Sequence, residues 1–275
     1  MSLFTDRTVL ITGASRGLGE AFAVAVAERG AVPLLTARSV DDLARVARLV
    51  RERTGRICEV LPADAGSDDG LRRLIADVDR LGRPVDVLIN NAGFGGGGRF
   101  AELDVEHEIA MVRLNVEACM RLARHFLPGM LVRRSGGIIN VASLGAFMPM
   151  PFMATYGATK AFLLSWSEAL WGETRGTGVR VTALCPGPVP TNFNAVAGLP
   201  PSHNRAGAID PATAVEAAIR AFEDDRPSVV PGTIARLTSL APRVLPRKTM
   251  IAMAADSIGG RVLPRSEGGS RNAEG

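Results

Sequence analysis

Short apolar runs alternate along this chain with longer segments of helical periodicity, and this alternation limits the fold more than any other feature. Runs of strand length, rich in β-branched residues, occur at 8–11, 32–36, 57–61, 85–89, 137–142, 179–184 and 228–230. Helical periodicity marks 18–29, 41–53, 68–81, a long region that ends at 133, 155–175 and 211–222. Strands separated by helices pair in parallel, with helices on both faces of the sheet. The sequence therefore predicts a doubly wound α/β fold.

The length and composition of the chain fit one large globular domain. A chain of 275 residues is long enough for a single α/β core, and 47% hydrophobic with 22% charged residues excludes general disorder. We predict that residues 1–242 form this domain and that 243–265 form a partly helical C-terminal extension. Residues 266–275 are small and polar and are expected to be a disordered tail.

Charge, cysteine content and hydropathy narrow the classes of partner. The net charge of +4 comes from scattered basic residues without interleaved aromatic residues, which does not favour nucleic-acid binding. The three cysteines and three histidines show no ligand spacing, so the sequence predicts no metal site and no disulfide bond, and the histidines are expected to be surface or packing residues. Asparagine, glycine and proline interrupt the uncharged stretch 136–159, which argues against a transmembrane helix. The separated cysteines fit a reducing cytoplasm, and no N-terminal signal is visible, so a cytoplasmic location is expected.

A glycine-rich loop follows the first predicted strand and leads directly into the first predicted helix. Its sequence is Thr12-Gly13-Ala14-Ser15-Arg16-Gly17-Leu18-Gly19. Glycines let the backbone turn sharply and approach a pyrophosphate closely, and the N-terminus of the following helix attracts an anion. The alternative is a plain strand-to-helix turn, but this placement favours dinucleotide binding.

The single tyrosine of the chain, Tyr156, stands four residues before one of its only two lysines, Lys160. This spacing places both side chains on one face of a helix. A compact ammonium stabilises a nearby phenolate and lowers the phenol pKa, which is otherwise near 10. Such a phenol can give a proton to a carbonyl oxygen or take one from an alcohol. The pair therefore predicts acid/base chemistry.

Several motifs together resemble those of the short-chain dehydrogenase/reductase family. In chain order they are the TGxxxGxG loop at 12–19, Asn90-Asn91-Ala92-Gly93, Asn115, Ser143, Tyr156-x-x-x-Lys160 and Pro186-Gly187, and they span about two thirds of the chain. The resemblance implies a single-domain Rossmann-type fold and interconversion of a carbonyl and a secondary alcohol. It implies a catalytic set of Tyr156, Lys160, Ser143 on the substrate oxygen, and Asn115 holding a water molecule in a proton relay. Judged alone, Ser143 is a turn residue and Asn115 a mid-helix polar residue.

The resemblance and the loop together imply a set of cofactor contacts. They are Gly13, Ala14, Ser15, Arg16, Gly17, Leu18, Gly19, Arg38, Asp64, Asn91, Ala92, Gly93, Tyr156, Lys160, Pro186, Gly187, Val189 and Thr191. In the family pattern Asp64 contacts the adenine and Asn91 the adenosine ribose region. Val189 and Thr191 contact the nicotinamide carboxamide. Asp64 can equally be a loop residue that serves a turn.

The end of the second predicted strand favours NADP(H) over NAD(H). NAD enzymes usually present an acidic residue there to bind the ribose 2′-hydroxyl, but this strand ends in Thr36-Ala37-Arg38. With Arg16 in the glycine loop, two guanidinium groups can converge on a 2′-phosphate. The alternative is that both arginines are solvated surface residues.

An apolar segment between Ser143 and Tyr156 lies where a substrate would approach. Its members are Leu144, Phe147, Met148, Pro149, Met150, Phe152 and Met153. Such side chains adapt to irregular hydrophobic shapes, which favours a lipophilic ketone or alcohol, fatty-acyl or steroid-like. The alternative is a buried packing segment. The resemblance places a mobile substrate-covering loop at 191–207, and the glycines at 95–98 form either a mobile rim or a site of close backbone approach.

The C-terminal region and the family pattern complete the prediction. The apolar stretch 250–258 is expected to be a helix, either a peripheral arm that covers substrate or contacts a membrane or partner subunit, or a packed terminal helix. The sequence thus predicts a cytoplasmic NADP(H)-dependent oxidoreductase acting on CH–OH groups, which the resemblance implies is a homodimer or homotetramer. A non-catalytic NADP-binding regulator is one rival, but it has no need of the Ser-Tyr-Lys-Asn set. A methyltransferase, the other rival, would present an acid after the second strand.

Overall fold

One parallel seven-stranded sheet organises the chain in a computed structural model that describes residues 2–190 and 207–263. The strands are β1 (Thr8–Thr12), β2 (Val32–Thr36), β3 (Glu59–Val60), β4 (Val87–Asn90), β5 (Gly136–Val141), β6 (Val179–Leu184) and β7 (Ser228–Val229). Their order across the sheet is β3-β2-β1-β4-β5-β6-β7. Because β1 pairs with both β2 and β4, the winding of the chain reverses at β1. The predicted doubly wound parallel sheet is confirmed.

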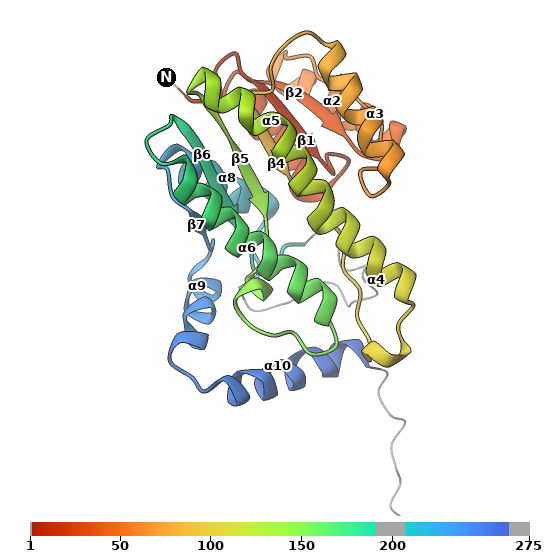
Figure 1. The fold of residues 1–275 in the computed structure, drawn as a ribbon, viewed down its shortest axis with the longest axis vertical. Helices are drawn as coiled ribbons and strands as arrows, with labels where there is room; N and C mark the ends of the chain where they lie inside the picture. The colour runs from red at the N-terminus through yellow and green to blue at the C-terminus, as the bar shows by residue number, and fades with distance from the viewer. Residues whose placement is uncertain (1, 191–206, 264–275) are drawn as a thin grey trace, which may run out of the picture.

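Helices cover both faces of the sheet (Figure 1). They are α1 (Gly17–Glu28), α2 (Val40–Thr54), α3 (Asp68–Arg80), α4 (Val105–Val112), α5 (Ala118–Arg133), α6 (Ala154–Thr174), α8 (Pro211–Glu223), α9 (Thr233–Leu240) and α10 (Arg247–Val262). Apolar residues from α1, α2 and α8 form the core on one face, and residues from α3, α5 and α6 form the core on the other.

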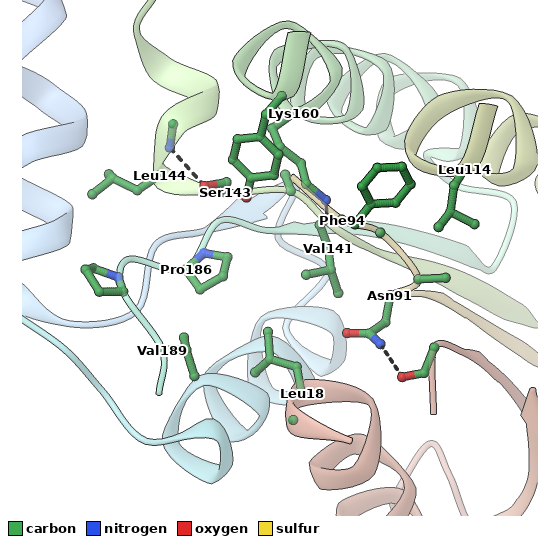
Figure 2. A pocket seen from close by; sticks show the side chains of 18 of the residues that line it. Leu18, Asn91, Phe94, Leu114, Val141, Ser143, Leu144, Lys160, Pro186 and Val189 are labelled. Atoms are coloured by element: carbon green, nitrogen blue, oxygen red, sulfur yellow. Dashed lines mark hydrogen bonds between the residues drawn. The ribbon is translucent and has the colours of Figure 1, made fainter. Parts of the chain in front are cut away.

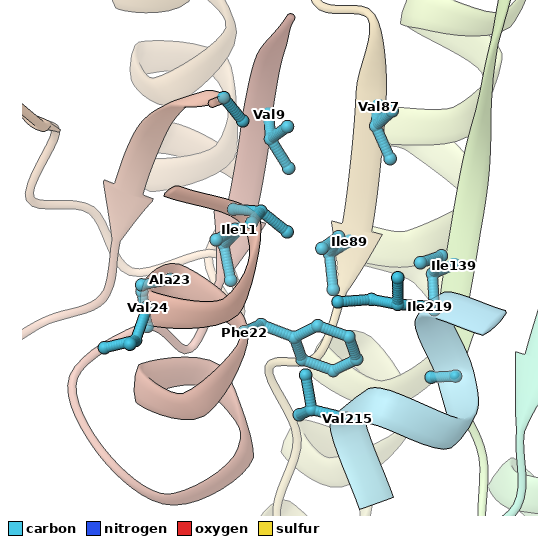
Figure 3. Packing of buried hydrophobic residues seen from close by; sticks show 14 of the residues in the cluster. Val9, Ile11, Phe22, Ala23, Val24, Val87, Ile89, Ile139, Val215 and Ile219 are labelled. Carbon is cyan, nitrogen blue, oxygen red and sulfur yellow. The ribbon is translucent and has the colours of Figure 1, made fainter. Parts of the chain in front are cut away.

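The alternation of side chains along β1 supplies both cores. Val9 and Ile11 point to the face of α1 and α8, where they pack near Phe22 and Ile219 (Figure 3). Leu10 points to the opposite face and belongs to the core of α3 and α5. Each side chain is fully buried, and such burial contributes roughly 1.5–3 kcal/mol per large aliphatic residue. The well-packed sheet therefore holds the carboxyl ends of its strands in fixed positions.

The long helical region predicted to end at 133 is helical without a break over 105–133, with a π-helical turn inside it and a separate 3-10 turn before it. It contains a 3-10 turn, η1 (Phe100–Glu102), then α4, a π-helical turn, η2 (Arg113–Glu117), and α5. A π turn adds one residue to the helix, and an apolar period of 3.6 does not reveal such an insertion. The turn carries Asn115, whose side chain bonds to a neighbouring loop.

The C-terminal segment folds back across one end of the molecule. α9, the 3-10 turn η4 (Ala241–Arg243) and α10 follow β7, and α10 runs across the end opposite α2 and α3 (Figure 1). The predicted helix at 250–258 is confirmed within the longer α10, whereas the sequence indicated no element at α9. Among the described residues, no helix has the length and apolar character needed to cross a membrane.

Candidate active site

The carboxyl ends of the central strands open on one cavity of about 1150 Å³. This position, at the reversal of winding beside β1, is where doubly wound sheets bind ligands. The cavity is lined by the predicted residues Gly13, Ser15, Arg16, Gly17, Leu18, Arg38, Asp64, Asn91, Ala92, Gly93, Ser143, Tyr156, Lys160, Pro186, Gly187 and Val189. In the view of Figure 2, Ser143 and Lys160 lie above this cavity and Leu18 and Val189 lie below it. Ala14, Gly19 and Asn115 are buried behind the lining, and Thr191 lies outside the described residues.

The glycine loop makes the tight turn that its sequence predicts. Gly13 and Gly17 adopt left-handed backbone conformations, with φ of +65° and +61°. α1 begins at Gly17, and its N-cap residue Arg16 supplies no side-chain cap, whereas Ser39 caps α2. The backbone N–H groups of the first turn of α1 therefore remain available beside the cavity, which is the arrangement that binds an anion.

Substitution of Gly19 by alanine is expected to destabilise the protein by about 1–3 kcal/mol, the usual cost of overpacking. A Cβ at Gly19 would lie 2.1 Å from the carbonyl oxygen of Gly13 and 2.7 Å from Nδ2 of Asn91, so the loop must move. Chemical denaturation measures the free energy of unfolding. The matched control is Gly172→Ala in α6, where a Cβ meets nothing within 4 Å; that change should leave stability equal or higher. Equal stability of both variants would contradict the prediction.

Asn91 holds the glycine loop in place. Its Nδ2 donates to the carbonyl oxygens of Thr12 and Gly13, at 2.9 and 3.0 Å. In return the Oγ1 of Thr12 accepts from the backbone N–H groups of Asn91 and Ala92, both at 3.0 Å. Sequence reasoning assigned Asn91 to the ribose and gave Thr12 no role. The structure gives both residues the task of positioning the loop.

The two arginines predicted to converge on a phosphate both line the cavity, but only Arg38 has no acidic partner there among the residues described. Arg16 forms an ion pair with Asp42, with Nη2 and Oδ2 2.6 Å apart. The Arg16 guanidinium, with help from the Ser39 hydroxyl, lowers the pKa of the Asp42 carboxyl. Part of the expected charge of Arg16 is therefore balanced at the start of α2. Sequence spacing gave no signal for this pair, because 26 positions separate the residues.

Asp64 lines the cavity and also serves a turn. Its Oδ1 accepts from the backbone N–H of Gly66 at 3.0 Å, and its carbonyl oxygen accepts from the Ser67 backbone N–H and hydroxyl. The turn alternative is therefore present in the structure. A contact with an adenine stays a prediction.

Tyr156, Lys160 and Ser143 meet at the inner end of the cavity. Tyr156 and Lys160 are 8% and 5% exposed, and the ammonium Nζ lies 5.9 Å from the centre of the phenol ring. Lys160 donates to the carbonyl oxygen of Val141 at 2.8 Å. Ser143 follows β5, and its Oγ accepts from the backbone N–H of Gly145 at 3.1 Å. α6 and the end of β5 thus bring the three predicted polar side chains together.

The electrostatics of this cluster differ from the sequence prediction. Burial raises the pKa of the Tyr156 phenol, and a hydrogen bond with the Ser143 side chain opposes that change. Burial also lowers the pKa of Lys160, to about 8. In the protein alone the phenol pKa is therefore raised and not lowered as expected, because desolvation is the largest contribution to it.

The side chain of Asn115 is hydrogen-bonded to a neighbouring loop. Its Nδ2 donates to the carbonyl oxygen of Phe94 and to Oγ1 of Thr159, at 2.9 and 3.1 Å, and its Oδ1 accepts from the Phe94 backbone N–H at 3.1 Å. A Cβ at Gly93 would lie 2.9 Å from this Oδ1 and 3.5 Å from Nζ of Lys160. Asn115 therefore positions the segment beside Lys160. The predicted water-mediated relay stays a prediction, and Thr159 is a partner that sequence reasoning missed.

The apolar segment between Ser143 and Tyr156 divides between cavity and core. Leu144, Met148 and Met150 line the cavity, whereas Phe147, Phe152 and Met153 pack in hydrophobic clusters. The cavity wall is completed from elsewhere by Phe94, His107, Ala110, Leu114, Thr238, Ala241, Met250, Met253, Ala254, Ser257 and Ile258. The packing alternative is thus correct for three of the seven residues, Met150 takes part in both cavity and core, and α10 supplies a second methionine-bearing wall.

Two further features correct or refine the sequence prediction. His107, expected to be a surface or packing residue, is exposed and packs against Phe94, with ring centres 5.1 Å apart, and it also lies on the cavity wall. A Cβ at Gly97 would lie 2.9 Å from Cγ1 of Val262 in α10. The glycines at 95–98 therefore allow close approach of neighbouring groups, which is one of the two alternatives. Most of the predicted covering loop at 191–207 lies outside the described residues.

Within the described ranges, no group of three or more His, Cys, Asp or Glu side chains is placed to hold a metal ion.

Comparison with known proteins places this site in context. A family model described as short chain dehydrogenase matches residues 7–199. The chain is 34% identical over 230 residues to the ketoacyl reductase HetN of a Nostoc species, which covers 84% of this chain and 80% of that protein. It is similar in structure to a short-chain dehydrogenase from Sphingobium yanoikuyae in complex with NADPH, with a TM-score of 0.78, 29% identity and coverage of 96% and 99% of the two chains. It also resembles a bulky-bulky ketone specific alcohol dehydrogenase from Comamonas testosteroni, with a TM-score of 0.73, 26% identity and coverage of 98% and 99%.

Proposed function

Because the chain belongs to the short-chain dehydrogenase family, we propose that it is an NADP(H)-dependent oxidoreductase that interconverts a carbonyl and a secondary alcohol on a lipophilic substrate. The observation that carries the proposal is the buried cluster of Tyr156, Lys160 and Ser143 at the inner end of the cavity. Acid/base chemistry at a carbonyl oxygen needs a proton donor in a water-poor site. Tyr156 is the one phenol in the chain.

Each residue of the cluster has a separate proposed role in proton transfer at the substrate oxygen. In the reducing direction, Tyr156 gives its phenolic proton to the carbonyl oxygen, and in the oxidising direction it takes the proton back. Ser143 donates a hydrogen bond to the same oxygen and stabilises the charge that develops there. Lys160 holds a positive charge near the phenol and favours the phenolate that remains after proton transfer. NADPH, when bound, supplies the hydride.

The outer half of the cavity fits a phosphorylated dinucleotide. The uncapped N-terminus of α1 faces the cavity beside Ser15 and Leu18, and such a helix end accepts a pyrophosphate. Arg38, which is exposed at the end of β2, would meet a 2′-phosphate, while Arg16 would have to share its charge with Asp42. Solved relatives in complex with NADPH support this choice of cofactor.

Arg38→Asp is expected to weaken NADPH binding by tenfold or more and to leave NADH binding equal or tighter. A hydrogen bond to a charged group contributes roughly 1.5–3 kcal/mol, and an aspartate would repel the 2′-phosphate. Fluorescence titration with both nucleotides measures the two dissociation constants. Arg48→Asp, at an exposed position in α2 away from the cavity, is the matched control. Equal losses of affinity for NADPH and NADH in the Arg38 variant would refute the assignment.

The inner half of the cavity supports a lipophilic substrate. Met148 and Met150 face it from one side and Met250 and Met253 from α10, and thioether side chains adapt to irregular apolar shapes. The similarity to a ketoacyl reductase and to an alcohol dehydrogenase specific for bulky ketones also supports a lipophilic substrate.

The proposal includes assembly into two or four copies of the chain, and light scattering measures the number of copies.

The direct test follows NADPH absorbance with a panel of bulky ketones and keto-acyl thioesters, beside a polyhydroxylated ketone. The proposal predicts turnover of apolar members above that of the polar one. Turnover of the polar ketone alone would overturn the substrate class. Tight NADPH binding without turnover of any member would instead favour the alternative, a non-catalytic NADP-binding regulator on the same fold.

A further inference from the structure

The C-terminal arm, defined here as α9, η4 and α10, exposes an unusual number of large apolar side chains. They are Ile234, Leu237, Leu240, Val244, Leu245, Ile251 and Met253. Val244 is 81% and Leu237 65% exposed. Soluble proteins rarely gather such side chains in one region unless it binds something.

The side chains on the inner face of α10 are buried against the rest of the protein. Met250, Ala254 and Ile258 are buried at a spacing of four residues, and the last two lie in one cluster with Tyr156 and Met153. This face holds α10 against the cavity. The exposed residues of the arm are therefore not needed for the fold within the described residues.

Basic side chains stand among the exposed apolar ones. Arg236, Arg243, Arg247 and Lys248 are exposed, and none of them pairs with a carboxylate of residues 2–190 or 207–263. Segment 233–263 contains five basic residues and one acidic residue, Asp256. Many arginines elsewhere in the chain do form ion pairs, for example Arg29 with Glu216.

The arm is also continuous with the cavity. Met253 lines the cavity and is 55% exposed, and Thr238 and Ala241 line the cavity from α9 and η4. Figure 1 shows α9 and α10 as an arm at one end of the molecule, beyond the carboxyl ends of the strands. The apolar and basic surface thus surrounds one side of the cavity mouth.

We propose that the C-terminal arm docks on the surface of an anionic phospholipid bilayer, with the cavity mouth turned toward the membrane. Basic residues bind acidic headgroups while neighbouring apolar side chains enter the interface. A second copy of the chain is a poorer occupant, since a two-fold contact presents the same surface twice and would bring uncompensated cations together. The docking does not depend on the proposed redox activity.

Vesicle sedimentation of the full chain tests the proposal. We expect binding to vesicles that contain phosphatidylglycerol, much weaker binding to vesicles of phosphatidylcholine alone, and release by salt. The triple variant Arg236→Glu/Arg243→Glu/Arg247→Glu should lower partition to the anionic vesicles by at least about a hundredfold, since each lost cation near such a surface contributes roughly fivefold and the added carboxylates repel the acidic headgroups. Its control is Arg48→Glu/Arg51→Glu/Arg73→Glu on α2 and α3, which should retain binding.

A second pair of variants separates lipid docking from self-association. Leu237→Ser/Val244→Ser should weaken vesicle binding at least several-fold, whereas Val132→Ser, at an 84% exposed position in α5, should not. Circular dichroism and gel filtration check fold and oligomeric state. The proposal is overturned if the wild type does not bind anionic vesicles, or if both arginine triples lose binding equally. It is also overturned if Leu237→Ser/Val244→Ser changes the number of associated copies and leaves lipid binding intact.

Discussion

Turnover of a confirmed substrate by Tyr156→Phe is expected to fall by at least about a hundredfold, the usual effect of losing a general acid. The substitution keeps the ring, which is 8% exposed and packs with Met153 and Ile258. It removes only the hydroxyl and its hydrogen bond with Ser143. Because one neutral hydrogen bond contributes roughly 1 kcal/mol, the fold and NADPH binding should survive.

Steady-state kinetics, thermal unfolding and nucleotide titration together test this expectation. No second tyrosine exists to serve as a Tyr→Phe control, so Phe162→Leu, at a partly exposed position on the same helix, serves instead. That control should keep its activity. Near wild-type turnover by Tyr156→Phe would refute acid/base catalysis by the phenol and would favour the regulator.

The sheet was predictable because its strands are buried on both faces. Runs such as 8–11 and 179–184 are mainly apolar and rich in β-branched residues, and the structure places β1 and β6 there. The edge strand β3 was less predictable. Of the predicted run 57–61, only Glu59–Val60 forms a strand in the structure, and Ile57 at the start of the run is 70% exposed. A short apolar run does not reveal whether its side chains find a core.

Sequence reasoning predicted which residues line the cavity better than it predicted the contacts between those residues. Motif positions at strand ends converge because parallel strands share one carboxyl edge, and most predicted residues do line the cavity. The pair of Arg16 with Asp42 and the bonds of Asn115 to Phe94 join residues far apart in the sequence. No spacing encodes such contacts. His107 was missed for the same reason, because a single histidine on a helix carries no local signal.

Desolvation is the effect that sequence reasoning underestimated. The motif predicts that Lys160 acts on Tyr156, but both side chains lie in a site that penalises charge. The ordinary pKa values of tyrosine and lysine are close together, both about 10, so raising the phenol pKa and lowering the ammonium pKa moves the two values apart. Lys160, with its pKa lowered to about 8, therefore titrates in a range that experiments can reach.

Lys160→Arg is expected to reduce turnover by about a hundredfold or more, although it preserves positive charge. The Nζ of Lys160 lies 2.8 Å from the Val141 carbonyl oxygen, and a Cβ at Gly93 would be only 3.5 Å from it. A planar guanidinium does not fit where a compact ammonium is enclosed on these sides. Lys160→Met, which removes the charge with less added bulk, guards against a failure to fold. Wild-type turnover by the arginine variant would show that charge alone suffices.

The pH dependence of NADPH binding makes this test specific to the lysine. Burial lowers the pKa of Lys160 to about 8, so the ammonium is present below that pH and is lost as the pH rises through it. Wild-type affinity for NADPH should therefore weaken above pH 8, or at a higher pH if binding itself stabilises the ammonium. Tyr156 and Cys119 do not explain such a limb, because burial raises the pKa of the phenol and raises that of Cys119 to about 11. The limb should disappear in Lys160→Met and in Lys160→Arg, whose guanidinium stays charged. Its persistence in both folded variants would assign the titration to another group and remove Lys160 from the proposed binding role.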